Sequence, residues 1–127
     1  MSELFEEKAF FIRGMRICVK HWHAQSTHHP VIALHGWLDN AASFDLLAPL
    51  LSQYSIAAID LAGQGLSENR PASATYHLWD DLLDILAIAD ELGWQTFSLI
   101  GHSRGAMLSV MLAASCVERI KGIVLID

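Results

Sequence analysis

The pentapeptide Gly101–Gly105 (GHSRG) carries a serine with a glycine two positions away on each side. A short apolar run, Thr96–Gly101, leads into it, and a mostly apolar stretch of helical character, Arg104–Cys116, follows it. Where a buried strand turns sharply into a helix, a serine at the turn is held in a strained conformation, and only small residues fit on either side. We therefore predict that Ser103 has a positive φ and acts as a nucleophile. An ordinary glycine-rich turn is the alternative.

The tripeptide His35-Gly36-Trp37 directly follows another short apolar run, Val31–Leu34. A reaction that passes through a tetrahedral oxyanion needs two backbone N–H donors aimed at that oxygen. The amide of Arg104, directly after the serine, is one candidate donor. The amide of Trp37 is the other, in a loop that Gly36 allows to approach closely. The alternative is that the Trp37 side chain only packs.

A third motif, Asp60–Ser67 (DLAGQGLS), contains Gly63 and Gly65 directly after an apolar run. Its Gly-x-Gly spacing also fits the start of a dinucleotide-binding fingerprint. That fingerprint requires a third glycine where Glu68 stands, and a helix where Pro71 follows. Nucleotide binding is therefore disfavoured, and no cofactor is predicted.

Four of the seven histidines cluster early in the chain. A convincing zinc site among them would need a thiolate or carboxylate nearby. We therefore predict histidines of loops and edge strands, and no metal site. These residues are His21, His23, His28 and His29.

Apolar periodicity predicts an α/β fold in which strands alternate with helical segments. This alternation is typical of a parallel sheet covered by helices on both faces. In chain order the predicted elements are an antiparallel hairpin (Lys8–Arg13 and Met15–His23), strand Val31–Leu34, a helix from about Ser43, strand Ser55–Asp60, loop Leu61–Thr75, helix Tyr76–Leu92 ended by Gly93, strand Thr96–Gly101, helix Arg104–Cys116 and strand Ile120–Asp127.

The two long predicted helices differ in their surfaces. Tyr76–Leu92 carries five acidic residues and no base, which indicates a solvated face. Arg104–Cys116 is apolar nearly all round, which indicates a helix packed in the interior. The five acidic residues are Asp80, Asp81, Asp84, Asp90 and Glu91.

The composition of the 127-residue chain is apolar for a single domain. Hydrophobic residues make up 53% and charged residues 17% of the chain, whereas about 25% charged is typical. The net charge of −6 argues against nucleic acid or an anionic membrane surface as a partner. No uncharged apolar run approaches about 18 residues, so no transmembrane helix is predicted.

The chain start and the cysteines predict a cytoplasmic location. The first residues, MSELFEEK, are acidic where a secretory signal is basic. Cys18 and Cys116 are too few for a disulfide framework, so we expect reduced thiols.

HGW, DLAGQGLS and GHSRG, in this order and spacing, resemble the N-terminal half of an α/β-hydrolase of the esterase, lipase and peroxidase type. The run HGWLDNAASFDLLAPLL is especially similar to the serine hydrolase-like proteins of that superfamily. The resemblance implies an α/β fold with a mostly parallel sheet of about six strands and helices on both faces. It also implies Ser103 as the nucleophile and the amides of Trp37 and Arg104 as the oxyanion hole. The residues that would shape the motifs are His35, Gly36, Asp60, Gly63, Gly65, Gly101, His102 and Gly105.

Two features qualify the resemblance. Ala62 and Gln64 stand where relatives often carry Arg or Gly and His, in a loop that is structural in the family. A serine at position 103 argues against the haloalkane dehalogenase and epoxide hydrolase branches, whose nucleophile is aspartate.

The catalytic order in this fold is serine, acid, histidine, and all seven histidines precede Ser103. We therefore expect residues 1–127 to form an incomplete α/β-hydrolase domain, from the first to the sixth strand, ending before the lid and the histidine loop. Asp127, at the end of the sixth predicted strand, is one candidate for the acid. An acid after a seventh strand is the other.

The expected activity of the parent protein is hydrolysis of an ester or similar small acyl substrate through an acyl-enzyme. The 127-residue chain itself is expected to be inactive. Two alternatives remain open: carbon–carbon bond hydrolysis or perhydrolysis on the same scaffold, and a non-catalytic or truncated remnant. An unpaired edge at the sixth strand would also favour self-association.

Overall fold

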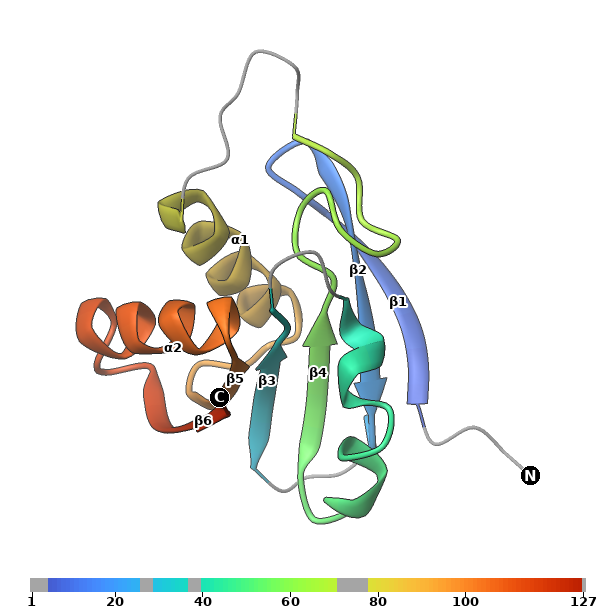
Figure 1. Cartoon of the computed structure of the whole chain (residues 1–127), viewed down its shortest axis with the longest axis vertical. Helices are drawn as coiled ribbons and strands as arrows, with labels where there is room; N and C mark the ends of the chain where they lie inside the picture. The colour runs from blue at the N-terminus through green and yellow to red at the C-terminus, as the bar shows by residue number, and fades with distance from the viewer. Residues whose placement is uncertain (1–4, 26–28, 37–39, 71–77, 127) are drawn as a thin grey trace.

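The predicted order of the six strands and the two long helices is confirmed in the computed structural model of the chain (Figure 1). The structure describes residues 5–25, 29–36, 40–70 and 78–126. The strands are β1 (Phe5–Ile12), β2 (Met15–Trp22), β3 (Pro30–Leu34), β4 (Ser55–Ile59), β5 (Phe97–His102) and β6 (Ile120–Ile126). The helices are α1 (Leu78–Glu91), α2 (Arg104–Ser115) and two 3₁₀ helices, η1 (Ala41–Phe44) and η2 (Ala48–Leu50).

Six strands form one sheet in the order β1-β2-β4-β3-β5-β6. β3 runs parallel to β4 and to β5, and β5 runs parallel to β6. β2 is antiparallel to both β1 and β4. Arg13 and Gly14 join β1 to β2 with φ values of 50° and 83°, as the tightest hairpin turns require. The sheet is thus mostly parallel, with an antiparallel hairpin at one edge.

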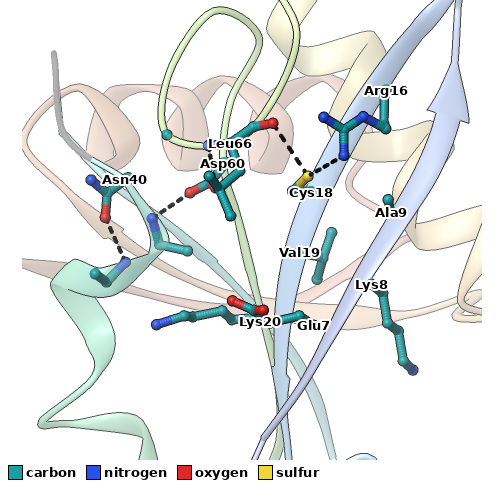
Figure 2. A pocket seen from close by; sticks show the side chains of 13 residues that line it. Glu7, Lys8, Ala9, Arg16, Cys18, Val19, Lys20, Asn40, Asp60 and Leu66 are labelled. Atoms are coloured by element: carbon teal, nitrogen blue, oxygen red, sulfur yellow. Dashed lines mark hydrogen bonds between the residues drawn. The ribbon is translucent and has the colours of Figure 1, made fainter.

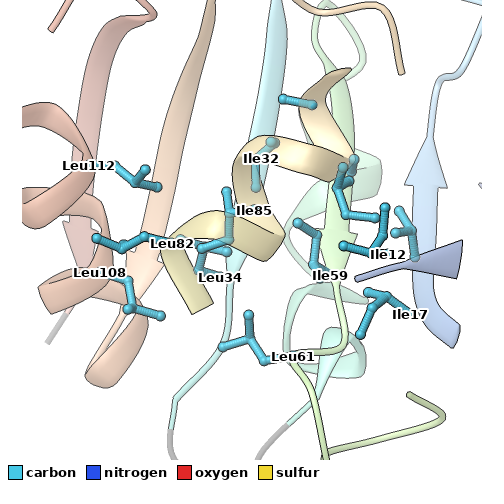
Figure 3. Close-up of a cluster of buried hydrophobic side chains, with 14 of the residues drawn as sticks. Ile12, Ile17, Ile32, Leu34, Ile59, Leu61, Leu82, Ile85, Leu108 and Leu112 are labelled. Atoms are coloured by element: carbon cyan, nitrogen blue, oxygen red, sulfur yellow. The ribbon is translucent and has the colours of Figure 1, made fainter. Parts of the chain in front are cut away.

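Side chains of the central strands alternate between two apolar layers. Ile32 and Leu34 of β3 and Ile59 of β4 contribute to the layer that contains α1 and α2, where Figure 3 shows them beside Leu82 and Leu108. The opposite layer contains η1 and η2. Its buried residues include Val31, Ala33, Phe44, Ala48, Ile56 and Ala58. Helices cover both faces of the sheet, as predicted.

The prediction of a helix from about Ser43 is wrong. Two 3₁₀ helices replace it, and the first begins two residues earlier, capped by the Asn40 side chain, which accepts a hydrogen bond from the Ala42 amide at 2.8 Å. Pro49 lies in the second 3₁₀ helix. Because proline has no N–H and clashes with the preceding turn, a continuous α-helix through this segment is disfavoured.

The prediction that the acidic residues of α1 form a solvated face is also wrong in part. The side chains of Asp81 and Asp84 are buried, with residue exposures of 3% and 1%. They lie on the same side of α1 as Ile85 and Ile88, because positions three and four apart share a helix face. Arginines from other segments neutralise them, as described below.

The predicted burial of α2 on all sides is wrong as well. Gly105, Leu108 and Leu112 are buried, whereas Met107 and Val110 are exposed. Within the part of the chain that the structure describes, α2 packs on β3, β5, β6 and α1 from one side only. Its outer apolar side is therefore uncovered in that part.

The exposed apolar edge of strand β6 leads us to predict that the 127-residue chain self-associates. Among the described residues, β6 pairs only with β5, and Ile123, Val124, Leu125 and Ile126 are all exposed. Because an open apolar strand edge templates pairing with another chain, residues 1–127 prepared alone should elute as species larger than the 14.0 kDa monomer. Size-exclusion chromatography with light scattering measures this.

A matched pair of variants distinguishes pairing through β6 from nonspecific association of exposed apolar surface. Val124→Lys places a charge on β6, and Val110→Lys places the same charge on the exposed side of α2. Val124→Lys should shift the chain toward monomer and Val110→Lys should not. A wild-type monomer, or equal effects of both variants, would contradict pairing through β6.

Candidate active site

Ser103 lies alone between the end of β5 and the first residue of α2. Its backbone angles are φ 56° and ψ −114°, and its side chain is exposed. The Ser103 carbonyl accepts the first hydrogen bonds of α2, from the amides of Ala106 (2.9 Å) and Met107 (3.2 Å). The predicted positive φ at a strand-to-helix turn is confirmed, which puts the hydroxyl at the positive end of the helix dipole.

The two flanking glycines allow the close backbone contacts that create this turn. A Cβ on Gly101 would collide with the Gly105 carbonyl group and the Ser109 hydroxyl. A Cβ on Gly105 would collide with the carbonyl groups of Leu34 and His35. The start of α2 therefore rests directly on the backbone at the end of β3, and no larger residue fits at either glycine.

The His35–Gly36 segment lies beside the serine. A Cβ on Gly36 would be 3.3 Å from both the Ser103 Cβ and the His102 Nδ1. His35 is fully buried, and its Nε2 accepts a hydrogen bond from the Leu61 amide at 3.0 Å. The other ring nitrogen, Nδ1, then carries the proton and donates to the Gly36 carbonyl at 2.7 Å. His35 therefore links two loops and is not placed to accept a proton from Ser103.

Two residues of the predicted site lie outside the described residues. These are Trp37, the expected second oxyanion donor, and Asp127, the candidate acid. Arg104 is described, and it is the first residue of α2. The roles assigned to all three remain predictions.

The Asp60 carboxylate organises the loop after β4. It accepts hydrogen bonds from the Ala41 amide (2.7 Å) and the Leu66 amide (2.9 Å), as Figure 2 shows. Gly65, with φ 56°, approaches so closely that a Cβ there would collide with the carboxylate. Gly63 is also in the left-handed region, with φ 79°. These contacts fit the shaping role expected for this motif.

A buried network of ion pairs joins α1 to three other segments. One Arg70 nitrogen lies 2.9 Å from Asp81 Oδ1 and 2.8 Å from Asp84 Oδ2. Arg13, in the β1–β2 turn, lies 3.1 Å from Asp84 Oδ1, and Arg104 lies 2.8 Å from Asp81 Oδ2. Burial raises the pKa of Asp84, against the opposing effect of Arg70 and Arg13. The arginines keep these buried carboxylates paired, as buried charges require.

This network is absent from the sequence prediction. A signal for it exists in the helical spacing, because Asp81, Asp84 and Ile88 recur at intervals of three and four residues and so share a face with the apolar residues. The partners Arg13 and Arg70 come from distant segments. The sequence of α1 alone gives no means of finding them.

His21 is also placed differently from the prediction. β2 lies between β1 and β4, so it is not an edge strand, and His21 is buried. The Lys8 ammonium lies 2.9 Å from His21 Nδ1, which must accept, so Nε2 carries the proton and donates to the Ser55 hydroxyl at 2.7 Å. His21 therefore cannot act as a base toward Ser55. In the part of the chain that is described, no group of three or more His, Cys, Asp or Glu residues could hold a metal.

Burial, followed by the charge of Lys8, lowers the pKa of His21 from 6.5 to about 4. Because the folded pKa is depressed, the contribution of this group to stability is present above pH 6.5 and is lost as the pH falls toward 4. The free energy of unfolding should thus fall by about 2 kcal/mol more between pH 7 and pH 5 in the wild type than in His21→Gln. Urea unfolding at the two pH values measures this, and equal pH dependence would contradict it.

A cavity of about 550 Å³ lies over the outer face of the β1–β2 hairpin, between η1 and the loop after β4 (Figure 2). None of its lining residues comes from β5 or α2. Cys18, in its floor, donates a hydrogen bond to the Leu66 carbonyl, and burial raises the pKa of its thiol. The cavity is therefore separate from Ser103 and contains no activated nucleophile.

None of the helices in the described part of the chain is both long and apolar enough to cross a bilayer.

The comparisons with known proteins agree with the observed fold. Residues 29–127 match the model of the alpha/beta hydrolase fold family. The chain is 39% identical over 116 residues to a serine hydrolase-like protein of Dictyostelium discoideum. The matched region covers 90% of this chain and 32% of that protein. The chain therefore belongs to the α/β-hydrolase fold family.

Two examples illustrate the similarity of this chain to solved structures. One is a hypothetical protein of Pseudomonas aeruginosa PAO1, with 47% identity and a TM-score of 0.90 over 96% of this chain and 43% of that one. The other is a thioesterase domain from the curacin biosynthetic pathway, with 32% identity and a TM-score of 0.85 over 97% of this chain and 46% of that one. The chain thus spans about a third of the Dictyostelium relative and less than half of each solved structure.

Proposed function

We propose that Ser103 is the nucleophile of a serine hydrolase that acts on an ester or a similar acyl substrate. The observation that carries this proposal is the exposed serine with φ 56° at the N-terminus of α2, directly beside the Gly36 loop. A strained, exposed serine at such a turn is the arrangement in which this fold presents a nucleophile. The family membership and the serine hydrolase-like relative support the same reading.

In the proposed reaction the Ser103 oxygen bonds to the substrate carbonyl carbon and its proton passes to a histidine base. The tetrahedral oxyanion receives hydrogen bonds from the amides of Arg104 and Trp37. Collapse breaks the bond to the leaving alcohol, which takes up the proton, and leaves an acyl-enzyme. Water then releases the acid and restores the serine.

The base in this scheme comes from outside residues 1–127. Both ring nitrogens of His35 are engaged, and His21 donates to Ser55, so neither is available to Ser103. The relatives are longer than this chain, and in this fold the histidine follows the serine and the acid. We place the histidine in that additional length, with Asp127 as one candidate for the acid.

Thioesters are a second candidate substrate class within the same chemistry. The thioesterase domain similar to this chain supports that choice. The attacking and oxyanion-binding groups would be the same, and only the leaving thiol would differ. Parallel assays with p-nitrophenyl acetate and an acyl thioester distinguish the two classes.

Ser103→Ala in the full-length protein that contains this chain should abolish covalent labelling by a fluorophosphonate probe. It should also lower kcat for p-nitrophenyl ester hydrolysis by at least about 10³-fold, because the nucleophile is lost. The exposed turn position means that the melting temperature should change little. A matched control is Ser115→Ala, which removes another exposed serine at the far end of α2. Unchanged labelling of Ser103→Ala would contradict the proposal.

Residues 1–127 alone should not turn over ester substrates at an enzymatic rate. Without a base the hydroxyl stays protonated and is a poor nucleophile. The oxyanion donors and substrate binding alone support about 10³- to 10⁴-fold over water, the level that remains in triad knockouts of intact enzymes. The test is hydrolysis of p-nitrophenyl acetate after circular dichroism has confirmed folding, with Ser103→Ala as the blank. A Ser103-dependent rate comparable to that of ordinary esterases would show that a base is recruited from this chain or from a second copy.

A further inference from the structure

Asp81 links the buried ion network to the residue directly after Ser103. One of its carboxylate oxygens lies 2.9 Å from Arg70, and the other lies 2.8 Å from Arg104. Asp81 is only 3% exposed and comes from α1, whereas Arg104 is the first residue of α2. The contact is therefore a tertiary one that fixes the start of one helix to the side of another.

Other ion pairs of the network hold Asp81 in place. The same Arg70 nitrogen that binds Asp81 also binds Asp84 at 2.8 Å, and Asp84 binds Arg13 at 3.1 Å. Asp80 completes the set by pairing with Arg13 at 3.2 Å. Three guanidinium groups thus face three carboxylates. Because unpaired buried charges are strongly disfavoured, Asp81 has little freedom to move away from Arg104.

We propose that Asp81 is a positioning residue for the reaction at Ser103. By holding the Arg104 side chain, it fixes the backbone of the first turn of α2. The Arg104 N–H is thereby aimed at the oxyanion that forms on the substrate. This inference rests on the proposed function, because it concerns the oxyanion donor of that same site.

The backbone at this point needs such a support. Ser103 occupies a sparsely populated conformation, φ 56° and ψ −114°, which persists only where the surroundings determine it. The contact of Gly105 with the Leu34 carbonyl fixes α2 against the sheet from below. Asp81, on the neighbouring helix α1, holds the same turn of α2 through its ion pair with Arg104, the residue between Ser103 and Gly105. Two contacts in different directions fix an orientation that neither fixes alone.

Asp84 provides a matched control for a purely structural role. It is as buried as Asp81, lies on the same helix and binds the same Arg70 nitrogen. Its other partner is Arg13, in the β1–β2 turn, and not Arg104. Asp81→Asn and Asp84→Asn should therefore lower the melting temperature by similar amounts, since each removes one charge from the same network.

The kinetic outcome should separate the two variants. In the full-length protein, Asp81→Asn should lower kcat for p-nitrophenyl ester hydrolysis by about 10- to 100-fold with KM nearly unchanged, because a misplaced donor weakens only the transition state. Asp84→Asn should keep kcat within about threefold of wild type. Equal kcat values for the two variants would overturn the inference.

A variant of the partner residue Arg104 keeps the test valid if Asp81→Asn does not fold, and a double-mutant cycle extends the test if it does. The Arg104 side chain is 17% exposed, less buried than that of Arg70 at 4%, so Arg104→Met should fold. It should reproduce the kcat loss, and adding Asp81→Asn should lower kcat no further. A wild-type kcat in Arg104→Met, or additive losses, would overturn the inference. Full activity of Ser103→Ala would instead refute the proposed function itself, so the two failures are distinguishable.

Discussion

The direct contact between the start of α2 and the end of β3 is the constraint on which the site depends. Gly105 lies against the Leu34 carbonyl, and Gly101 lies against Gly105, with no room for a Cβ at either position. The chain must therefore reverse from strand to helix within one residue, and Ser103 takes the positive φ that this requires. An exposed hydroxyl at a helix N-terminus follows from that packing, and so does the nearness of the Gly36 loop.

The packing and the ion pairs around this contact hold the strained turn and helix α2 in one arrangement. On one side of the sheet α1 and α2 share a core with the central strands, and the Arg13, Arg70 and Arg104 guanidinium groups meet the acids of α1. Buried ion pairs of this kind add little net stability compared with apolar packing, but they tolerate few alternative geometries. We interpret the Asp81–Arg104 ion pair as the contact of this network that sets the orientation of α2, while the apolar core supplies most of the stability.

Features set by local sterics were predictable from the sequence, and features set by distant partners were not. The turn at Ser103 and the succession of strands and long helices along the chain follow from glycine spacing and short apolar runs. The apolar spacing around Ser43 predicts a continuous helix, but Pro49 interrupts that pattern. Residue type alone predicts that Asp81 and Asp84 are solvated, although their spacing places them on the buried side of α1. The local sequence predicts an edge position for His21, because the place of β2 inside the sheet depends on β4, which follows later in the chain.

The most direct test of the account is to locate the covalent adduct in the full-length protein. After reaction with a fluorophosphonate probe, proteolysis and mass spectrometry should place the label on Ser103 in the GHSRG peptide, at one probe per protein. The buried Ser55 beside His21 should not be labelled, and among the described residues no other hydroxyl combines exposure with a strained turn like that of Ser103. A stoichiometric label on another residue, with Ser103 unmodified, would contradict the central claim that this turn presents the nucleophile.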